Sequence, residues 1–512
     1  MTDYLNVVRR FADNVLARGR DPFRSTPMFC DGLNLDTMRP VEWLCNGERW
    51  AICNPHTQQH LFRTFVALSN LTGDPKYRDA ARDAMLYFFE HHSDSTGLLK
   101  WGGHQFVDLR TGREVGEAPL HEFKCSYPFY EFLFEIAPQR TKRFVEALWN
   151  GHVYDWSNLD MTRHGEFDRP MGKLWASDYV GGDVFFYGRG LTFINCGSDL
   201  VYAAGLLHAF TRERGPLLWA KRLAHRYVEA RDPKTRLGAY QFSQPIPSAG
   251  VGKAGTLSSG GDRAKNQFGP EFGERALEGK VLDPYRAGMI YGNATIAQMR
   301  IAEKLGDEGR EFIDWNHNGL LAYARHAYDA ETNTVAAMFT DGTRLAPDDV
   351  KRPGYYSRAT FEPKQASPML LLSYALAYRL TRDEELMKTV RAMARAHEQN
   401  SSDPIVLFAM LELYQATDDP GYLERAGAIA ENIVRDRFRG DFFLPSKNHV
   451  NASFNASFNA LEPLALLSLE AARAGKRDAV PAYNGGQPFI HGPFDGKGRA
   501  KDGPAIWSVT RS

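Results

Sequence analysis

Residues 60–92 read HLFRTFVALSNLTGDPKYRDAARDAMLYFFEHH. The first half is apolar nearly all round, which is typical of a helix buried on both sides. The second half has one apolar stripe and one charged face. A short polar turn containing Gly-Asp separates the two halves. The stretch therefore predicts a helical hairpin whose first helix faces inward and whose second helix forms an outer wall.

The same pattern recurs along the chain, at residues 199–230, 292–328, 367–397 and 403–438. Such units cannot bury their apolar faces alone, so they stack side by side, and about six or seven of them can close into a barrel. The predicted fold class is all-α, an (α/α) toroid of helical hairpins that forms one catalytic domain over 1–512. An open solenoid that binds a protein or carbohydrate partner is the alternative.

Long, irregular loops rich in aromatic residues connect the hairpins at 99–121, 154–195 and 239–285. Loops of this size in a compact domain are usually functional, so we expect them to form partly β cleft walls. The range 239–285 contains a Gly/Ser/Lys-rich stretch and is the best candidate for an insert or lid. Residues 481–512 are predicted to be an irregular C-terminal tail packed on the barrel.

Composition excludes several classes of partner. The 62 basic and 62 acidic residues cancel, which argues against nucleic acid or an anionic membrane as the main partner. No apolar run is long enough to span a bilayer, and no obligate protein partner is evident. The five cysteines form no Cys-x-x-Cys pair, so we expect reduced, structural thiols. The N-terminal segment has helical spacing and no signal-peptide pattern, which predicts a cytoplasmic enzyme.

Three loop segments carry candidate chemistry. His104 lies in a Gly-rich segment, His121 and Glu122 follow with Lys124 nearby, and Arg163 and His164 are adjacent in NLDMTRHGEF. Two imidazoles and a carboxylate can bind a divalent ion of Mn, Fe, Co, Ni or Zn and leave further coordination positions of the ion open. Taken singly, each residue also has an ordinary structural interpretation, and the spacing is no tight local motif.

The type and order of His104, Glu122, Arg163 and His164 resemble the metal site and catalytic arginine of the family 2 polysaccharide lyases, which are pectate lyases. The length and the helical repeats are similar too. This resemblance implies an (α/α) toroid whose central cleft binds galacturonan and a divalent cation, most often Mn²⁺. It implies cleavage of (1→4)-α-D-galacturonan or oligogalacturonides by metal-assisted β-elimination to 4,5-unsaturated products. Members without a signal peptide act on short imported oligogalacturonides, often from the chain end.

The resemblance implies that His104, Glu122 and His164 hold the cation and that Arg163 takes the C5 proton of the substrate. A guanidinium is normally protonated, but a nearby divalent cation and a desolvated pocket both disfavour its charged form. An alkaline pH optimum would follow. The alternative is that Arg163 only positions the substrate while His121 or Tyr179 takes the proton.

Basic and aromatic residues of the cleft-wall loops could grip uronate carboxylates or stack on sugar rings. The substrate-binding candidates are Lys173, Trp175, Tyr179, Arg189 and Arg286, with Lys124 and Arg358 as further basic residues. Helical toroids also host sugar epimerases and uronide hydrolases. An epimerase would use histidine pairs without a metal, and a hydrolase would use carboxylates such as Asp160, Glu166, Asp168 and Asp178.

Overall fold

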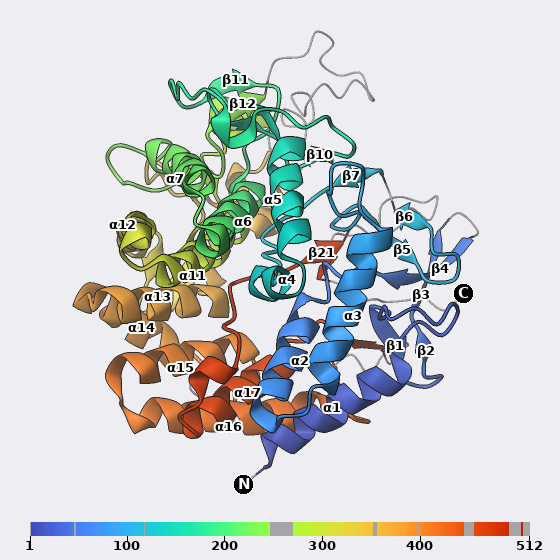
Figure 1. The fold of residues 1–512 in the computed structure, drawn as a ribbon. Helices are drawn as coiled ribbons and strands as arrows, with labels where there is room; N and C mark the ends of the chain where they lie inside the picture. The colour runs from blue at the N-terminus through green and yellow to red at the C-terminus, as the bar shows by residue number, and fades with distance from the viewer. Residues whose placement is uncertain are drawn as a thin grey trace. The chain divides into compact units, whose positions relative to one another are not determined.

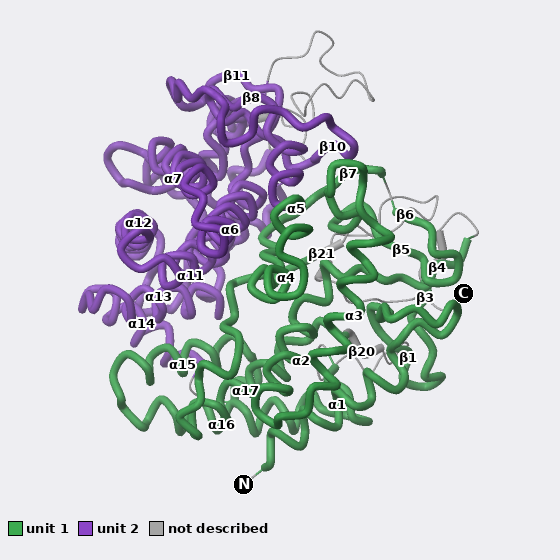
Figure 2. Tube along the Cα trace, viewed as in Figure 1, with its two compact units in different colours: residues 1–144, 398–512 green, residues 145–397 purple. Residues whose placement is uncertain are grey.

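The computed structural model describes residues 2–45, 48–116, 118–245, 270–351, 356–397, 400–444, 455–490 and 503–504. The chain divides into two compact units (Figure 2). Unit 1 comprises residues 1–144 and 398–512, and unit 2 comprises residues 145–397. The first boundary falls inside helix α5 (Pro138–His152). A single catalytic domain over 1–512 stays a prediction.

Unit 1 is built on two predicted hairpins and on a third pair of helices that is distant in sequence (Figure 1). Helices α2 and α3 pack together, as do α15 and α16, and α1 packs against α17. The first long helix of the chain therefore pairs with the last. The helices of unit 1 are α1 (Tyr4–Arg18), α2 (Gln59–Thr72), α3 (Lys76–His91), α4 (Tyr130–Ile136), α15 (Pro404–Thr417), α16 (Pro420–Arg437) and α17 (Glu462–Arg473).

Unit 2 contains three further predicted hairpins, α6 with α7, α11 with α12, and α13 with α14. A π-helical segment, η3 (Gly288–Ala294), runs directly into α11. The helices of unit 2 are α6 (Ile194–Thr211), α7 (Arg214–Glu229), α9 (Glu274–Leu277), α10 (Pro284–Ala287), α11 (Thr295–Leu305), α12 (Arg310–His326), α13 (Pro368–Thr381) and α14 (Glu384–Arg395).

In these hairpins the first helix is the buried inner one and the second is the outer one, as predicted. Helices α6, α13 and α15 are buried over most of their length. Their partners α7, α14 and α16 bury one face and leave the other to solvent. Because an all-round apolar helix needs neighbours on both sides, this pattern follows from the sequence. The predicted all-α class, with paired helices of the (α/α) type, is confirmed.

Four hairpins share one turn, in which a threonine ends the first helix, a left-handed residue follows, and an acidic residue starts the second. The turns are Thr72-Gly73-Asp74, Thr211-Arg212-Glu213, Thr381-Arg382-Asp383 and Thr417-Asp418-Asp419. In each, the acidic residue's N–H donates to the threonine hydroxyl at 3.2–3.3 Å. Asp383 and Asp419 also cap the next helix with their carboxylates, a contact worth about 1 kcal/mol.

Short strands lie in the three long loops, as predicted, and others lie outside these loops. In unit 1, β3, β4, β5 and β6 form an antiparallel sheet and β1 pairs with β2 and β20. The strands of unit 1 are β1 (Gly32–Asn34), β2 (Arg39–Pro40), β3 (Glu42–Cys45), β4 (Glu48–Cys53), β5 (Gln105–Asp108), β6 (Glu114–Gly116), β7 (Leu120–His121), β18 (Phe438–Arg439), β19 (Phe442–Phe443), β20 (Asn455–Ser457), β21 (Phe489–Ile490) and β22 (Gly503–Pro504).

In unit 2 the strands pair as β8 with β9, β11 with β12, β13 with β16, and β14 with β15 and β17. They are β8 (Val153–Asp155), β9 (Asp160–Met161), β10 (Gly165–Glu166), β11 (Phe186–Gly188), β12 (Ser243–Pro245), β13 (Val281–Leu282), β14 (Tyr328–Asp329), β15 (Thr334–Val335), β16 (Met338–Phe339) and β17 (Lys364–Gln365). Much of the predicted insert (239–285) and of the predicted tail (481–512) lies outside the described residues. Within the described part of the chain, no helix is long and apolar enough to cross a membrane.

Candidate metal centre and its support

Two of the predicted metal ligands lie side by side in unit 1. His104 directly precedes β5, and Glu122 directly follows β7. The Nε2 atom of His104 lies 2.9 Å from Oε2 of Glu122, and the two side chains are 6% and 0% exposed. Two ligand atoms that bind one first-row cation at about 2.1 Å and at right angles are about 3 Å apart. This buried N/O pair therefore fits a divalent cation.

The glycine pair before His104 allows the two ligand loops to approach each other closely. The N–H of Gly103 donates to the carbonyl of Glu122 at 2.8 Å. Gly102 has φ +117°, and a Cβ atom there would lie 2.6 Å from the same carbonyl oxygen. Because that distance is shorter than any real Cβ contact and the φ favours glycine, only glycine fits at residue 102.

A buried polar chain fixes Gly102 from the other side. The Nδ2 atom of Asn54 donates to the carbonyl of Gly102 at 2.9 Å. The backbone N–H of Asn54 donates to Oδ1 of Asp31 at 2.8 Å, and Asp31 also accepts bonds from Gln58 and Thr57. Burial raises the pKa of Asp31 to about 7, although these hydrogen bonds oppose the rise. The position of Glu122 therefore depends on residues far from it in sequence.

The segment that follows Glu122 is held by the polar start of α2. Nε2 of His56 lies 2.6 Å from the hydroxyl of Ser126, and Arg63 donates to the carbonyl of Tyr127 at 3.0 Å. Burial lowers the pKa of His56 to about 3, so its ring is neutral at physiological pH. Cys125 and Tyr127 both have positive φ, a strained conformation that persists only where the surroundings impose it.

Lys124 and His121 lie close in sequence to the predicted ligand Glu122. The Nζ atom of Lys124 lies 3.3 Å from Oε1 of Glu122, which makes the two an ion pair. His121 is fully buried, and its ring packs against Phe123 and Phe144. This burial argues against His121 as the group that takes a proton from a substrate.

Arg163 and His164 belong to unit 2, on the short loop between β9 and β10. Both side chains are partly exposed. The N–H of His164 donates to the Thr162 hydroxyl at 3.1 Å, and the ring of His152 bonds to the Thr162 carbonyl at 2.7 Å. The guanidinium of Arg163 lies 5.6 Å from the centre of the Phe193 ring. The backbone of His164 is thus fixed by Thr162, and both side chains are partly exposed.

Two substrate-binding candidates, Trp175 and Tyr179, pack in an aromatic cluster that includes Trp219 of α7. The ring of Trp175 lies 5.2 Å from that of Trp149, and its carbonyl accepts the indole N–H of Trp219. The ring of Tyr179 lies 5.7 Å from that of Trp219, with the guanidinium of Arg222 over it. These contacts give both residues a packing role, and their contact with substrate stays a prediction.

The basic candidates differ in exposure. Arg286 is buried, forms an ion pair with Asp283, and lies over the ring of Tyr356. Arg189 is 68% exposed, with its guanidinium over the ring of Tyr154, and Lys173 is exposed as well. An exposed guanidinium can meet a substrate carboxylate directly, so Arg189 is the better placed arginine of the two.

Among the carboxylates that a hydrolase would use, Asp160 has a structural task. Its oxygens accept the backbone N–H groups of Arg189 and Gly190 at 2.6 Å and 3.0 Å. Glu166 is partly exposed, and Asp168 and Asp178 are exposed. Burial raises the pKa of Asp160, but its two bonds tie it to the 189–190 turn.

Sequence reasoning missed the residues that support the ligand loops. Asn54, His56 and Arg63 are all buried, and they lie at or just before the start of the inner helix α2. The signal was present in NPHTQQHLFR (54–63), a polar stretch leading into a helix that should be buried. Buried polar side chains need hydrogen-bond partners, so such a stretch indicates a network within the core.

The chain matches the family described as "Periplasmic pectate lyase" over residues 26–493. It is 32% identical to the pectate disaccharide-lyase of Dickeya dadantii (strain 3937), over 97% of this chain and 94% of the relative. Solved structures with similar folds include a GH76 alpha-mannanase of Bacteroides thetaiotaomicron, with 10% identity, coverage of 93% and 97%, and a TM-score of 0.45. A sugar epimerase from a ruminal bacterium has 10% identity, coverage of 78% and 87%, and a TM-score of 0.46.

The family description corrects the predicted location. A periplasmic family contradicts the prediction of a cytoplasmic enzyme. That prediction depended on the helical pattern of the first residues, which form the amphipathic helix α1. Helix α1 packs on α17 within unit 1, so its pattern reports how the segment packs and not the compartment in which the protein works.

The family match covers most of the chain, and the relative is aligned over nearly its whole length. Both are pectate lyases, as the resemblance of the four site residues predicted. The chain belongs to the periplasmic pectate lyase family and is a polysaccharide lyase.

Proposed function

We propose that the protein cleaves (1→4)-α-D-galacturonan or oligogalacturonides by metal-assisted β-elimination, leaving a 4,5-unsaturated sugar at the new chain end. The observation that carries this proposal is the buried pair of His104 and Glu122, 2.9 Å apart. The name of the relative, pectate disaccharide-lyase, supports an acidic polysaccharide as substrate and the release of disaccharides.

In this proposal His164 joins His104 and Glu122 as the third ligand of a divalent cation, with Mn²⁺ as the first candidate. The donor set of two imidazoles and one carboxylate suits a first-row ion and leaves positions open for substrate oxygens. A bound cation supplies Lewis-acid stabilisation of the negative charge that develops beside the substrate carboxylate. Lys124 and the backbone of Gly103 hold Glu122 in place.

Arg163 acts on the substrate itself. As the base, it accepts the proton from C5, the electron pair of that C–H bond forms the C4=C5 double bond, and the C4–O bond breaks. The departing oxygen takes a proton from solvent, and Arg163 returns its own proton to solvent. No water is added across the bond, which distinguishes this reaction from hydrolysis. The partial exposure of Arg163 supports access to a substrate.

The test is to incubate the protein with polygalacturonate and Mn²⁺ and to follow the ultraviolet absorbance of the conjugated product. We expect absorbance to rise, disaccharides to accumulate, and a chelator to stop the reaction. No absorbance with any galacturonan length would overturn the lyase proposal. Full activity in excess chelator would overturn the metal role alone, and products of many lengths would overturn disaccharide release alone.

The ligand set is tested without turnover. Mn²⁺ bound to protein loses the sharp electron paramagnetic resonance signal of the free ion, so a titration counts sites and gives an affinity. We expect His164→Ala to weaken Mn²⁺ binding as strongly as His104→Ala does. The matched control is His91→Ala, on the exposed end of α3, which should bind Mn²⁺ normally. Unchanged binding in His164→Ala would remove that residue from the ligand set.

A further inference from the structure

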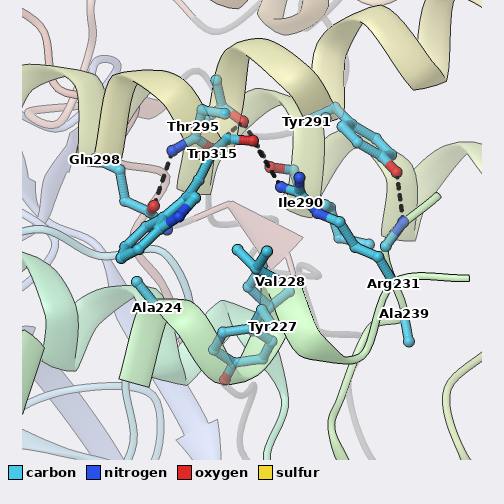
Figure 3. Close-up of a pocket in the computed structure, with 14 residues that line it drawn as sticks. Ala224, Tyr227, Val228, Arg231, Ala239, Ile290, Tyr291, Thr295, Gln298 and Trp315 are labelled. Carbon is cyan, nitrogen blue, oxygen red and sulfur yellow. Dashed lines mark hydrogen bonds between the residues drawn. The ribbon is translucent and has the colours of Figure 1, made fainter. Parts of the chain in front are cut away.

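A cavity in unit 2 is lined by side chains that the lyase proposal does not use (Figure 3). It lies among α7, α12, and the joined segments η3 and α11. The space that the centre of a water molecule can occupy inside it has a volume of about 30 Å³. One water needs about 10–15 Å³ by this measure, so the cavity has room for two or three atoms of a small ligand. A π-helical segment such as η3 often marks a functional site.

The neutral polar groups of the cavity wall bond to one another. The hydroxyl of Thr295 donates to Oδ1 of Asn316 at 3.0 Å, and Nδ2 of Asn316 donates to Oε1 of Gln298 at 2.8 Å. The hydroxyl of Tyr291 accepts the N–H of Gly238 at 2.8 Å. Figure 3 shows these bonds along the wall. They give the cavity a fixed shape.

Arg231 is the charged residue of the lining. It donates one hydrogen bond, from Nη2 to the carbonyl of Trp315 at 2.8 Å. Among the described residues, no carboxylate forms an ion pair with it. The carboxylate of the adjacent Asp232 is engaged by the N–H groups of Lys234 and Thr235 at 2.9 Å and 3.0 Å.

Burial therefore acts on Arg231 without a compensating negative charge. Desolvation lowers the pKa of Arg231, and Arg236 contributes in the same direction. A desolvated cation is costly to keep unless an anion pairs with it. The residue as a whole is partly exposed, and it lines the cavity.

We propose that this cavity binds the carboxylate group of a small organic acid, with Arg231 as its counter-ion. The planar guanidinium can donate two parallel hydrogen bonds to the two oxygens of a carboxylate. A carboxylate has three heavy atoms, which matches the size of the cavity, whereas a sugar ring is too large for it. Tyr291 and Trp315 also line the cavity. This site is independent of the lyase reaction.

Acetate is the probe, and acetamide is its neutral analogue of the same shape. Calorimetric titration of the full chain at constant ionic strength and pH should show saturable acetate binding with a Kd of about 1–10 mM, the range expected for so small a ligand. Acetamide should not bind. A rise in Tm should accompany acetate binding and saturate with it. Linear heats without saturation, or equal effects of acetate and acetamide, would overturn the proposal on the wild-type protein alone.

Variants assign the site to Arg231. Arg231→Gln should weaken acetate binding at least tenfold, and Arg231→Lys should retain weakened binding because the charge stays while the planar fork is lost. The matched control is Arg214→Gln, at the exposed first residue of α7, which should bind acetate as the wild type does. If Arg231→Gln does not fold, undiminished binding by Arg231→Lys would contradict the two-bond geometry. Equal acetate affinity in wild type and folded Arg231→Gln would show that Arg231 only ties the end of α7 to Trp315.

Discussion

The His104–Glu122 pair in unit 1 and the Arg163–His164 dipeptide in unit 2 are held in different ways. His104 and Glu122 are buried, and their loops are fixed by a close backbone approach at Gly102 and by hydrogen bonds from the core. Arg163 and His164 are partly exposed and lie on the three-residue link (162–164) between the short strands β9 and β10. The first region is enclosed and held by buried hydrogen bonds, whereas the side chains of the second are partly exposed.

This difference matches the tasks that the proposal assigns to His104, Glu122 and Arg163, whereas the proposed third ligand, His164, lies in the exposed region. Metal ligands gain affinity when buried hydrogen bonds hold them in the binding geometry before the ion arrives. A group that takes a proton from a long polysaccharide has to be reachable by it, so it cannot be enclosed in the same way. Substitutions in the two regions should therefore affect binding of the ion and turnover separately.

The largest effect is expected from Arg163→Ala. Removal of a general base typically lowers kcat by about 10²–10⁴-fold, and Mn²⁺ affinity should stay near that of the wild type. Steady-state kinetics on oligogalacturonide and a Mn²⁺ titration measure the two separately. Arg163→Lys should retain some turnover, with its optimum at lower pH, because lysine loses its proton more readily than arginine. Full turnover in Arg163→Ala would remove the residue from the reaction.

Glu122→Gln changes the buried region and should lower the affinity for Mn²⁺. It keeps the shape of the buried side chain but removes the charge that attracts a cation, so Mn²⁺ affinity should fall by at least about 100-fold. Activity should recover in part at high Mn²⁺, unlike in Arg163→Ala. Glu90→Gln, on the exposed face of α3, makes the same change of charge and should leave Mn²⁺ binding unaltered. Normal Mn²⁺ affinity in Glu122→Gln would place the ion elsewhere.

Asn54→Ala tests whether the rigidity of unit 1 matters. The substitution removes the hydrogen bond to the Gly102 carbonyl and leaves the three proposed ligands unchanged. Loss of a residue that supports metal ligands typically lowers metal affinity by about 10–100-fold. Asn70→Ala is the control, because Asn70 is exposed in the last turn of α2. If Asn54→Ala lowers stability but leaves Mn²⁺ affinity unchanged, the network supports the fold and not the ligands.

The sequence was sufficient for the hairpins, because helical periodicity and the position of polar turns are local properties. It could not show that α1 packs against α17, since that pairing joins the two ends of the chain. The candidate ligands came from a family resemblance. The support of Glu122 by Gly102, Asn54 and Asp31 joins segments that are far apart in sequence, and no local pattern encodes it.

The smallest effect is expected from Asp31→Asn, and it appears only in the dependence of stability on pH. Burial raises the pKa of Asp31 from 3.8 to about 7, so between these values the native state holds a proton that the unfolded chain has released. Stability from this group is therefore complete below about pH 4 and is lost as pH rises through about 7. Asparagine is neutral throughout and keeps an acceptor for the N–H of Asn54.

Urea unfolding of wild type and Asp31→Asn at pH 5 and pH 8 measures this contribution. The free energy of unfolding of the wild type should fall by about 1–3 kcal/mol relative to the variant over that interval. A parallel pH dependence in the two proteins would show that Asp31 is ionised at both pH values. The direction of this pH dependence bears on catalysis, because an arginine base predicts an alkaline pH optimum for activity. At that pH Asp31 is ionised, and the ligand loops then depend on the hydrogen bonds that Asn54, Gln58 and Thr57 donate to its carboxylate.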